Sequence, residues 1–356
     1  MSYPIPGLEP LNLGDISLSK MLGTGNFSYV QVAKSSLTKQ AYAVKTYDRV
    51  ALQRHKRGRD ALMEKHLLGR LCHRHVVKLV ATSSDVYGIY LITELCALGE
   101  LWNRCRGWGY PDMSARIFMR QIATAIEYLH RSGVVHRDIK AENIFVYDDR
   151  TVKLGDFGTG RDLLNPHIQP SETPSFKKSF RHFVGTPNFM APEVIANENN
   201  DIVADLWSFG CTVYQVLLGI PPFVASSDYF VFLRIKALDL AFPRVGISIQ
   251  AEEFIKAIVT PNRSNRLTID AIIAHPFFNG LPEQMPTFSE PESYALNAFA
   301  NIDDVNVENI SADPLVALDC GLAQRILFCE DWKQKSKPGA GAAALAHLDF
   351  AELEDD

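Results

Sequence analysis

Two short polar stretches that lie close together in the chain contain side chains suited to phosphoryl chemistry. The first has the sequence HRDIKAEN at residues 136–143, and the second, DFG, begins thirteen residues after Asn143 at Asp156. They supply two carboxylates, from Asp138 and Asp156, and the amide of Asn143. Such oxygen donors can hold a divalent metal ion and a hydroxyl nucleophile around one phosphoryl group. The spacing therefore predicts a catalytic loop.

A glycine-containing turn is expected to close over the phosphates. Residues 16–32 have the pattern of two strands joined by the turn GTGNFS at residues 23–28. Glycine has no Cβ, so backbone N–H groups there can approach phosphate oxygens. A dinucleotide-binding turn has similar glycines but opens a helix, whereas residues 29–32 continue as a strand. A hairpin lid over a nucleotide is the better interpretation.

A lysine and a glutamate on separate elements complete the candidate site. Lys45 ends a strand predicted over 41–45, twenty residues after Gly25, and Glu64 lies nineteen residues further on. Glu64 belongs to a helix predicted from about 54 to 71, whose apolar stripe is Leu62, Leu67, Leu68 and Leu71. Lys45 alone would be interpreted as a surface lysine at the end of a strand.

Further elements follow in order. Residues 76–95 predict two strands around the turn at 83–85, and a helix with Ser114 as its N-cap is predicted from the apolar spacing of 117–129. A long segment rich in Ser, Thr, Pro and Lys separates Asp156 from the sequence Ala191-Pro192-Glu193. Segments of this length are usually functional or disordered.

Taken together, these motifs resemble those of the protein kinases. The glycine turn, Lys45, Glu64, HRDxKxxN, DFG and Ala-Pro-Glu occur in the order of that family with compatible gaps. The resemblance implies an α+β, bilobal fold with a small antiparallel-sheet lobe carrying one regulatory helix and a larger, mainly helical lobe. The expected division is a leader at 1–14, a small lobe at 15–96, a large lobe at 97–280 and an acidic, partly disordered tail at 281–356.

The family resemblance also assigns roles to residues. Asp138 would orient the substrate hydroxyl, Lys140 would balance charge on the γ-phosphate, as in Ser/Thr kinases, and Lys45, paired with Glu64, would hold the α- and β-phosphates. Asn143 and Asp156 would bind Mg²⁺, and the cofactors would be ATP and Mg²⁺. The remaining residues expected at the nucleotide are Leu22, Gly23, Gly25, Ser28, Val30, Ala43, Thr93, Glu94, Cys96 and Glu100.

Three polar residues and one histidine are assigned to the scaffold of the protein. The resemblance implies that Asp205 accepts hydrogen bonds from the backbone of the catalytic loop and that Arg266 pairs with Glu193. His136 is interpreted as a packed core histidine rather than a base.

Within the family, the chain is most similar to the 3-phosphoinositide-dependent subfamily of the AGC group over residues 15–278. This resemblance implies that the protein substrates are other AGC kinases, phosphorylated in their activation loops. It also implies a small-lobe pocket for a phosphorylated hydrophobic-motif peptide, formed by Arg49, Lys65 and Thr82. Gln53 and Ser84 depart from the subfamily's pocket pattern, and ordinary charges on a helix face are the alternative interpretation.

The activation segment departs from the subfamily. The serine that usually precedes Phe183 is replaced by His182, so Ser179 is the nearest hydroxyl. We expect that the conformation of this segment is fixed either by a phosphate on Ser179, which would act through Arg137 and Arg161, or without any phosphate.

Composition sets the remaining expectations. The net charge is −5, yet residues 281–356 carry four Lys or Arg and fifteen Asp or Glu, whereas the preceding part is mildly basic. An acidic tail would be repelled by anionic lipid, and one amphipathic helix is predicted in it at 314–332. The six cysteines have no metal-binding spacing, and no stretch resembles a signal peptide or an eighteen-residue apolar span. We therefore expect a cytoplasmic protein that does not insert into membranes. No nucleic-acid binding is expected.

Two alternatives stay open from the sequence. One is a Ser/Thr kinase that recognises a different substrate motif, and the other is a kinase-fold scaffold that turns over little or no ATP. Substitution of Lys45 and Asp138 distinguishes the scaffold from an enzyme.

Overall fold

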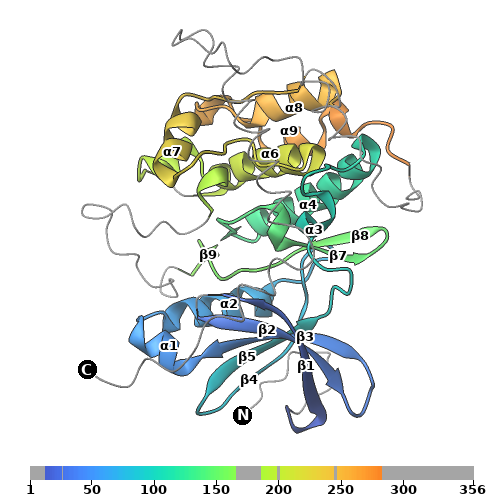
Figure 1. Cartoon of the computed structure of the whole chain (residues 1–356), viewed down its shortest axis with the longest axis vertical. Coiled ribbons are helices and arrows are strands. Elements are labelled where there is room, and N and C mark those ends of the chain that lie inside the picture. Colours follow the sequence, from blue (N-terminus) through green and yellow to red (C-terminus); the bar gives the residue numbers. More distant parts are fainter. Residues whose placement is uncertain (1–12, 26, 166–185, 199–200, 244–246, 283–356) are drawn as a thin grey trace, which may run out of the picture.

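The chain folds into two lobes with a cleft between them (Figure 1). The computed structural model describes residues 13–25, 27–165, 186–198, 201–243 and 247–282. The smaller lobe is a sheet covered by two helices, and the larger lobe is mainly helical. This arrangement confirms the predicted bilobal α+β fold.

The small lobe is built on a five-stranded antiparallel sheet with strand order β1-β2-β3-β5-β4. The strands are β1 (Ile16–Thr24), β2 (Ser28–Ser35), β3 (Ala41–Asp48), β4 (Leu79–Ser84) and β5 (Gly88–Glu94), and a 3₁₀ turn, η1 (Leu13–Asp15), precedes them. In the central strand, Lys45 pairs with Val30 on one side and Leu91 on the other. The register therefore places Lys45 in the middle of the sheet.

Two helices, rather than the single predicted helix, lie against this sheet. They are α1 (Arg49–Arg54) and α2 (Gly58–Arg70). Asp48 caps α1 by accepting a hydrogen bond from the Ala51 amide at 2.7 Å. The helices are separated where Lys56 takes a left-handed conformation with φ of 56°. The helix predicted from about 54 to 71 corresponds to α2, and α1 is an additional helix that was not predicted.

The buried face of α2 also differs from the predicted stripe. Leu67, Leu68 and, just after the helix, Leu71 are buried as expected, but Leu62 is 53% exposed. Ala61 and Met63 are buried in its place. The helix packs against both lobes, so its buried surface is rotated relative to a stripe chosen from leucines alone.

The large lobe contains the other described helices, two short antiparallel strand pairs and several 3₁₀ turns. Its helices are α3 (Trp102–Cys105), α4 (Asp112–Arg131), α5 (Pro192–Ile195), α6 (Ile202–Leu218), α7 (Asp228–Lys236), α8 (Ile249–Ile258) and α9 (Ile269–Ile273). Its strands are β6 (Val134–Val135), β7 (Ile144–Asp148), β8 (Thr151–Leu154) and β9 (Arg161–Asp162), and its 3₁₀ turns are η2 (Ala141–Asn143), η3 (Pro187–Phe189), η4 (Arg263–Asn265) and η5 (Pro276–Phe278).

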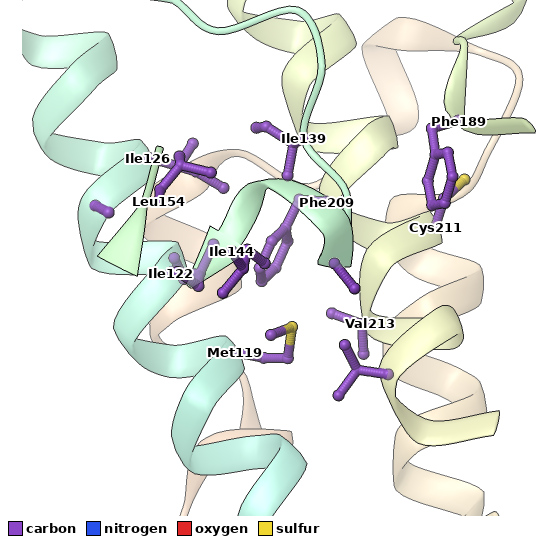
Figure 2. Packing of buried hydrophobic residues seen from close by; sticks show 14 of the residues in the cluster. Met119, Ile122, Ile126, Ile139, Ile144, Leu154, Phe189, Phe209, Cys211 and Val213 are labelled. Atoms are coloured by element: carbon purple, nitrogen blue, oxygen red, sulfur yellow. The ribbon is translucent and has the colours of Figure 1, made fainter. Parts of the chain in front are cut away.

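The core of this lobe lies between α4 and α6. Figure 2 shows Met119, Ile122 and Ile126 of α4 facing Phe209 and Val213 of α6, with Ile139 and Ile144 of the catalytic loop region between them. Burying apolar surface of this kind stabilises the fold by roughly 25 cal/mol per Å². The catalytic loop is therefore anchored by its own apolar residues.

The ends of the two long helices show different capping. Asp201 caps α6 by accepting from the Val203 amide at 3.0 Å, and the helix ends at Gly219 in a left-handed conformation with φ of 69°. The predicted N-cap of α4 is wrong: the helix begins at Asp112, and Ser114 lies buried inside its first turn. Pro111 occupies the N-cap position, with φ of −52° and ψ of 139°, and no side chain caps the helix there.

Short strands position the catalytic loop. Residues 136–143 lie between β6 and β7, and β6 pairs with β9, which follows the DFG sequence. β7 pairs with β8, which precedes DFG. The two polar stretches of the sequence are thus held together by two small antiparallel pairings.

None of the helices in the described ranges combines the length and the apolar character needed to span a bilayer. The amphipathic helix predicted at 314–332 and the candidate phosphosite Ser179 lie outside the described residues.

We predict that Arg266→Leu lowers the free energy of unfolding by about 3–5 kcal/mol, because it leaves the buried carboxylate of Glu193 without its cation. Arg266 Nη1 lies 2.7 Å from Glu193 Oε1, and the two side chains are 0% and 3% exposed. Urea denaturation measures the change.

Arg263→Leu is the matched control. Its ion pair with Asp201 is partly solvent-exposed, and such pairs contribute at most about 1 kcal/mol. Equal losses in the two variants would contradict the argument from burial.

Candidate active site

A cleft of about 380 Å³ lies between the lobes, and residues from both lobes line it. Every residue predicted to contact the nucleotide is on its surface: Leu22, Gly23, Gly25, Ser28, Val30, Ala43, Lys45, Glu64, Thr93, Glu94, Cys96, Glu100 and Asn143. Asp156 and Lys140 line it as well. Asp138 is not part of this lining, but it contacts Lys140 and Asn143, which are.

The cleft also has an apolar lining that the sequence analysis did not single out. Leu68, Val77, Leu91 and Phe145 contribute to it from four different elements. Their common signal is only that they are apolar, so they could not be distinguished from core residues in the sequence. Such a lining suits the flat apolar faces of a bound ring.

Lys45 lies between two carboxylates at the inner end of the cleft. Its Nζ is 3.0 and 2.9 Å from the two carboxylate oxygens of Glu64 and 2.8 Å from Asp156 Oδ1. Burial by itself lowers the pKa of Lys45, but Asp156 and Glu64 raise it well above its usual value. Lys45 is therefore a stable cation at neutral pH.

Asp156 is charged in this arrangement. Its pKa falls to about 2, chiefly because the Lys45 ammonium is adjacent, although burial acts in the opposite direction. Its side chain is 45% exposed to the cleft. A charged carboxylate directed into the cavity is the form that a divalent cation binds.

Gly158 packs closely against this cluster. A Cβ added at residue 158 would lie 3.3 Å from Asp156 Oδ1 and 3.4 Å from Glu64 Oε2. A side chain would thus crowd both carboxylates.

Tyr47 is a member of the cluster that the sequence analysis missed. Its hydroxyl donates a hydrogen bond to Glu64 Oε2, and the Lys45 ammonium lies 5.2 Å from its ring centroid. Tyr47 and Lys45 are two residues apart on β3 and so point to the same face of the sheet. That alternation was the available signal, but it does not by itself indicate a hydroxyl contact.

The catalytic loop forms a second polar group beside the first. Asp138 Oδ2 is 2.8 Å from Lys140 Nζ and 3.0 Å from Asn143 Nδ2, while Asp138 Oδ1 accepts from the Thr186 amide at 3.2 Å. Lys140 also donates to the Thr186 hydroxyl. Both oxygens of Asp138 are therefore oriented by neighbours.

The donor set fits a magnesium ion that shares ligands with phosphates. Asn143 donates through Nδ2 to Asp138, which leaves its Oδ1 as the atom available to a metal. No group of three or more His, Cys, Asp or Glu side chains suited to a metal occurs among the described residues. Mg²⁺ bound here would therefore take one or two protein ligands, Asp156 and Asn143, and complete its shell with phosphate and water.

Asp205 holds the backbone that presents Asp138, as predicted. Its carboxylate accepts from the amides of His136 at 2.9 Å and Arg137 at 2.8 Å, and from His130 at 3.0 Å. Burial raises the pKa of Asp205, but the bond from His130 and the neighbouring charges lower it below its usual value overall. His136 is fully buried, with Nε2 2.9 Å from the Gly155 carbonyl oxygen, which agrees with its interpretation as a packed histidine.

At the connection between the lobes, Glu94 uses its side chain for structure. It accepts from the Lys78 amide and from Lys153 Nζ, each at 2.8 Å. Burial raises the pKa of the neighbouring Cys96 to about 12, so the thiol is neutral. Burial and the nearby Glu142 raise the pKa of Glu100.

The three residues predicted to form a peptide pocket occupy separate elements of the small lobe. Arg49 starts α1 and is exposed, Lys65 lies in α2, and Thr82 in β4 is buried.

Comparison with known proteins places this geometry in a family. A model of the protein kinase domain matches residues 16–278. Serine/threonine-protein kinase ksg1 of Schizosaccharomyces pombe is 34% identical over 275 residues, which cover 76% of this chain and 46% of that protein.

Two further relatives extend the comparison. Serine/threonine-protein kinase PKH2 of Saccharomyces cerevisiae is 35% identical over 75% of this chain and 25% of its own length, and 3-phosphoinositide-dependent protein kinase 1 of Arabidopsis thaliana is 31% identical over 93% and 74%. The chain thus spans less than half the length of the first two relatives. These matches confirm the resemblance predicted from the motifs, and the chain belongs to the protein kinase family.

Proposed function

We propose that the chain is a Ser/Thr protein kinase that transfers the γ-phosphoryl group of Mg-ATP to hydroxyls of proteins. The observation that carries this proposal is that Lys45, Glu64, Asp156 and Asn143 line one cleft and that Asp138 contacts Asn143 directly at its edge. Family membership supports the same reaction class. Bound Mg-ATP supplies the phosphoryl group and the positive charge that offsets it.

Asp138 is proposed to orient the attacking hydroxyl. Its position is fixed by Lys140, Asn143 and Thr186, so the carboxylate needs no reorganisation when a substrate arrives. Lys140 would place its ammonium beside the transferred group. Phosphoryl transfer depends mainly on such positioning and charge compensation.

Lys45 is proposed to hold the nucleotide phosphates. Lysine has three N–H donors, and in this structure they face Glu64 and Asp156. When Asp156 holds the metal ion, the donor that now faces Asp156 would be free to bind phosphate, while the contact with Glu64 keeps the side chain extended. Gly23, Gly25 and Ser28 would close over the phosphates with backbone amides.

The proposed substrates are activation loops of other AGC kinases, as the resemblance to the 3-phosphoinositide-dependent subfamily implies. Arg49 and Lys65 are proposed to bind the phosphate of a hydrophobic-motif peptide near Thr82. The domain division proposed from the sequence, with lobes at 15–96 and 97–280 and a tail at 281–356, accompanies this assignment. A cytoplasmic location is also proposed, and the free thiols of Cys72, Cys96, Cys105 and Cys211 suit a reducing compartment.

Asp138→Asn is expected to lower kcat by about 10²–10⁴-fold, the range for a positioned acid–base group. Lys45→Met is expected to cost at least about 10²-fold in kcat/KM, because the phosphates lose their cation. Incorporation of radioactive phosphate into a generic Ser/Thr substrate measures both.

Asp149→Asn and Lys34→Met are matched controls, since both residues are exposed and away from the cleft. They should retain wild-type rates. If the protein has no activity above the Asp138→Asn background, the scaffold interpretation holds instead.

Tyr47→Phe is expected to raise the KM for ATP and lower kcat, together by about tenfold in kcat/KM. The variant removes one hydrogen bond to a charged carboxylate, which typically contributes about 1.5–3 kcal/mol. Steady-state rates at varied ATP concentration measure the change.

Tyr42→Phe is the control on the same strand, because the Tyr42 hydroxyl bonds to Gln40 rather than to the cleft. A Tyr47→Phe enzyme with the kinetics of Tyr42→Phe would remove Tyr47 from the site.

We compare two peptides: an AGC activation-loop sequence alone, and the same sequence joined to a phosphorylated hydrophobic motif. The joined peptide should have a kcat/KM about tenfold higher, as expected for charge-assisted phosphate binding. The double variant Arg49→Ala/Lys65→Ala should lose this advantage. Arg54→Ala, on the exposed surface of α1, should keep it. Equal use of both peptides by the wild-type protein argues for a kinase of different substrate choice.

A further inference from the structure

A buried carboxylate joins the two lobes at the point where β9 meets α2. Asp162, the second residue of β9, is 0% exposed. Its Oδ2 accepts from His66 Nε2 at 2.8 Å, from Asn165 Nδ2 at 2.8 Å and from Arg70 Nη1. Its Oδ1 accepts from the amides of Leu164 at 2.9 Å and Asn165 at 3.2 Å. We call Asp162, His66 and Arg70 the α2 clamp.

The carboxylate is fixed relative to the catalytic loop. Asp162 pairs with Val134 of β6, and the Leu163 amide donates to the Gly133 carbonyl at 2.8 Å. β6 leads directly into His136 and the catalytic loop. Asp162 therefore moves with the loop that carries Asp138.

The other two members of the clamp belong to α2. His66 and Arg70 are four residues apart, so they lie on the same face of the helix. Arg70 also donates through Nη2 to the carbonyl of Ser132, the C-cap residue that follows α4. In Figure 1, β9 lies between α2 and the helices of the large lobe, where such contacts can join them.

The face of α2 that carries Glu64 is a different one. Glu64 precedes His66 by two residues, which is about 200° around a helix with 3.6 residues per turn. Glu64 contacts Lys45 and Tyr47 of the sheet, whereas His66 and Arg70 contact the large lobe. A rotation of α2 that removed Glu64 from Lys45 would also separate Arg70 from Asp162.

The charges favour the contact of Asp162 with Arg70 and His66. Burial raises the pKa of Asp162, but hydrogen bonds from Asn165, His66, the Leu164 amide and Arg70 outweigh it and lower the pKa to about 2. The carboxylate is thus charged at neutral pH. A buried charge that loses its cationic partner is strongly destabilising, so the clamp resists rotation of α2.

We propose that Asp162, through Arg70 and His66, holds α2 in the orientation that keeps Glu64 on Lys45, and that this contact rather than an activation-segment phosphate sets the helix. The three residues are positioning residues, because none of them lines the nucleotide cleft. The catalytic consequence rests on the proposed kinase function, but the structural consequence does not.

The alternative is a phosphate, for instance on Ser179, that acts through Arg137 and Arg161. Arg137 Nε donates to the Thr159 carbonyl at 2.6 Å, and burial together with the nearby Arg161 lowers its pKa to about 10. A phosphate there would relieve this repulsion. The experiment must therefore distinguish positioning of α2 by the clamp from positioning of α2 by a phosphate.

Amide hydrogen exchange of the full chain tests the structural part without any need for activity. Arg70→Gln removes the cation, and His66→Gln is a milder second variant that preserves more of the fold. Exchange at residues 58–70 is expected to accelerate about tenfold or more in Arg70→Gln, as for loss of a buried ion pair, and less in His66→Gln. The control Arg59→Gln, an exposed position on the same helix, should exchange like the wild type.

Kinetics test whether the clamp acts through Glu64. Arg70→Gln should lower kcat/KM for ATP by about tenfold in the wild-type background and by less than about twofold when Glu64→Gln is already present, because coupled residues are non-additive. A general loss of folding would lower both backgrounds equally. Wild-type protein treated with phosphatase, and shown by mass spectrometry to carry no phosphate at residues 166–185, should keep its activity within about twofold.

The outcomes distinguish failure of the clamp proposal from failure of the proposed kinase function. Unchanged exchange at 58–70 in Arg70→Gln, equal losses in both Glu64 backgrounds, or loss of activity on dephosphorylation overturns the clamp. If the wild type has no kinase activity at all, the proposed function fails, and hydrogen exchange alone decides on the clamp.

Discussion

The balance of charge around Lys45 is the constraint on which the rest of the site depends. One ammonium lies between the carboxylates of Glu64 and Asp156, which come from α2 and from the segment after β8. Removing these groups from water is costly, and the cost is met only where each is paired and hydrogen-bonded. The trio has one positive and two negative charges, so it lacks one positive charge. A divalent cation at Asp156 would more than offset this negative charge, and phosphate and water would complete its shell, since the described residues form no group of three or more His, Cys, Asp or Glu metal ligands.

The loop beside this trio stores conformational strain. Arg137 and Asp156 both have left-handed backbone conformations, with φ of 67° and 55°, which are unfavourable for residues with a Cβ. Two buried groups hold them in place. The Asp205 carboxylate accepts from the amide of Arg137, and Phe157, fully buried, packs against the ring of His136 at 4.9 Å between centroids. These contacts therefore hold the backbone at Arg137 and Asp156 in conformations that are otherwise unfavourable.

The parts that the sequence predicted are those in which residue type determines geometry. Lys45, Asp138, Asn143 and Asp156 could be placed because few side chains serve their chemistry and their spacing fixes their order. The helix around Glu64 was predicted less well, since leucines at 62, 67, 68 and 71 suggested one face, whereas contacts with two lobes set another. Periodicity describes a helix that packs on one surface only.

Other residues could not be predicted because their partners are distant in the chain. The Tyr47 hydroxyl meets Glu64 seventeen residues away, and Asp162 meets Arg70 over ninety-two residues. In the sequence, a tyrosine in a strand and an aspartate near a turn are ordinary. These contacts are directional, unlike the burial of Ala61, Met63 and Leu67, which a helix can satisfy over a range of rotations. Apolar packing thus attaches α2 to the molecule, and the polar contacts on its two faces select the one rotation in which Glu64 reaches Lys45.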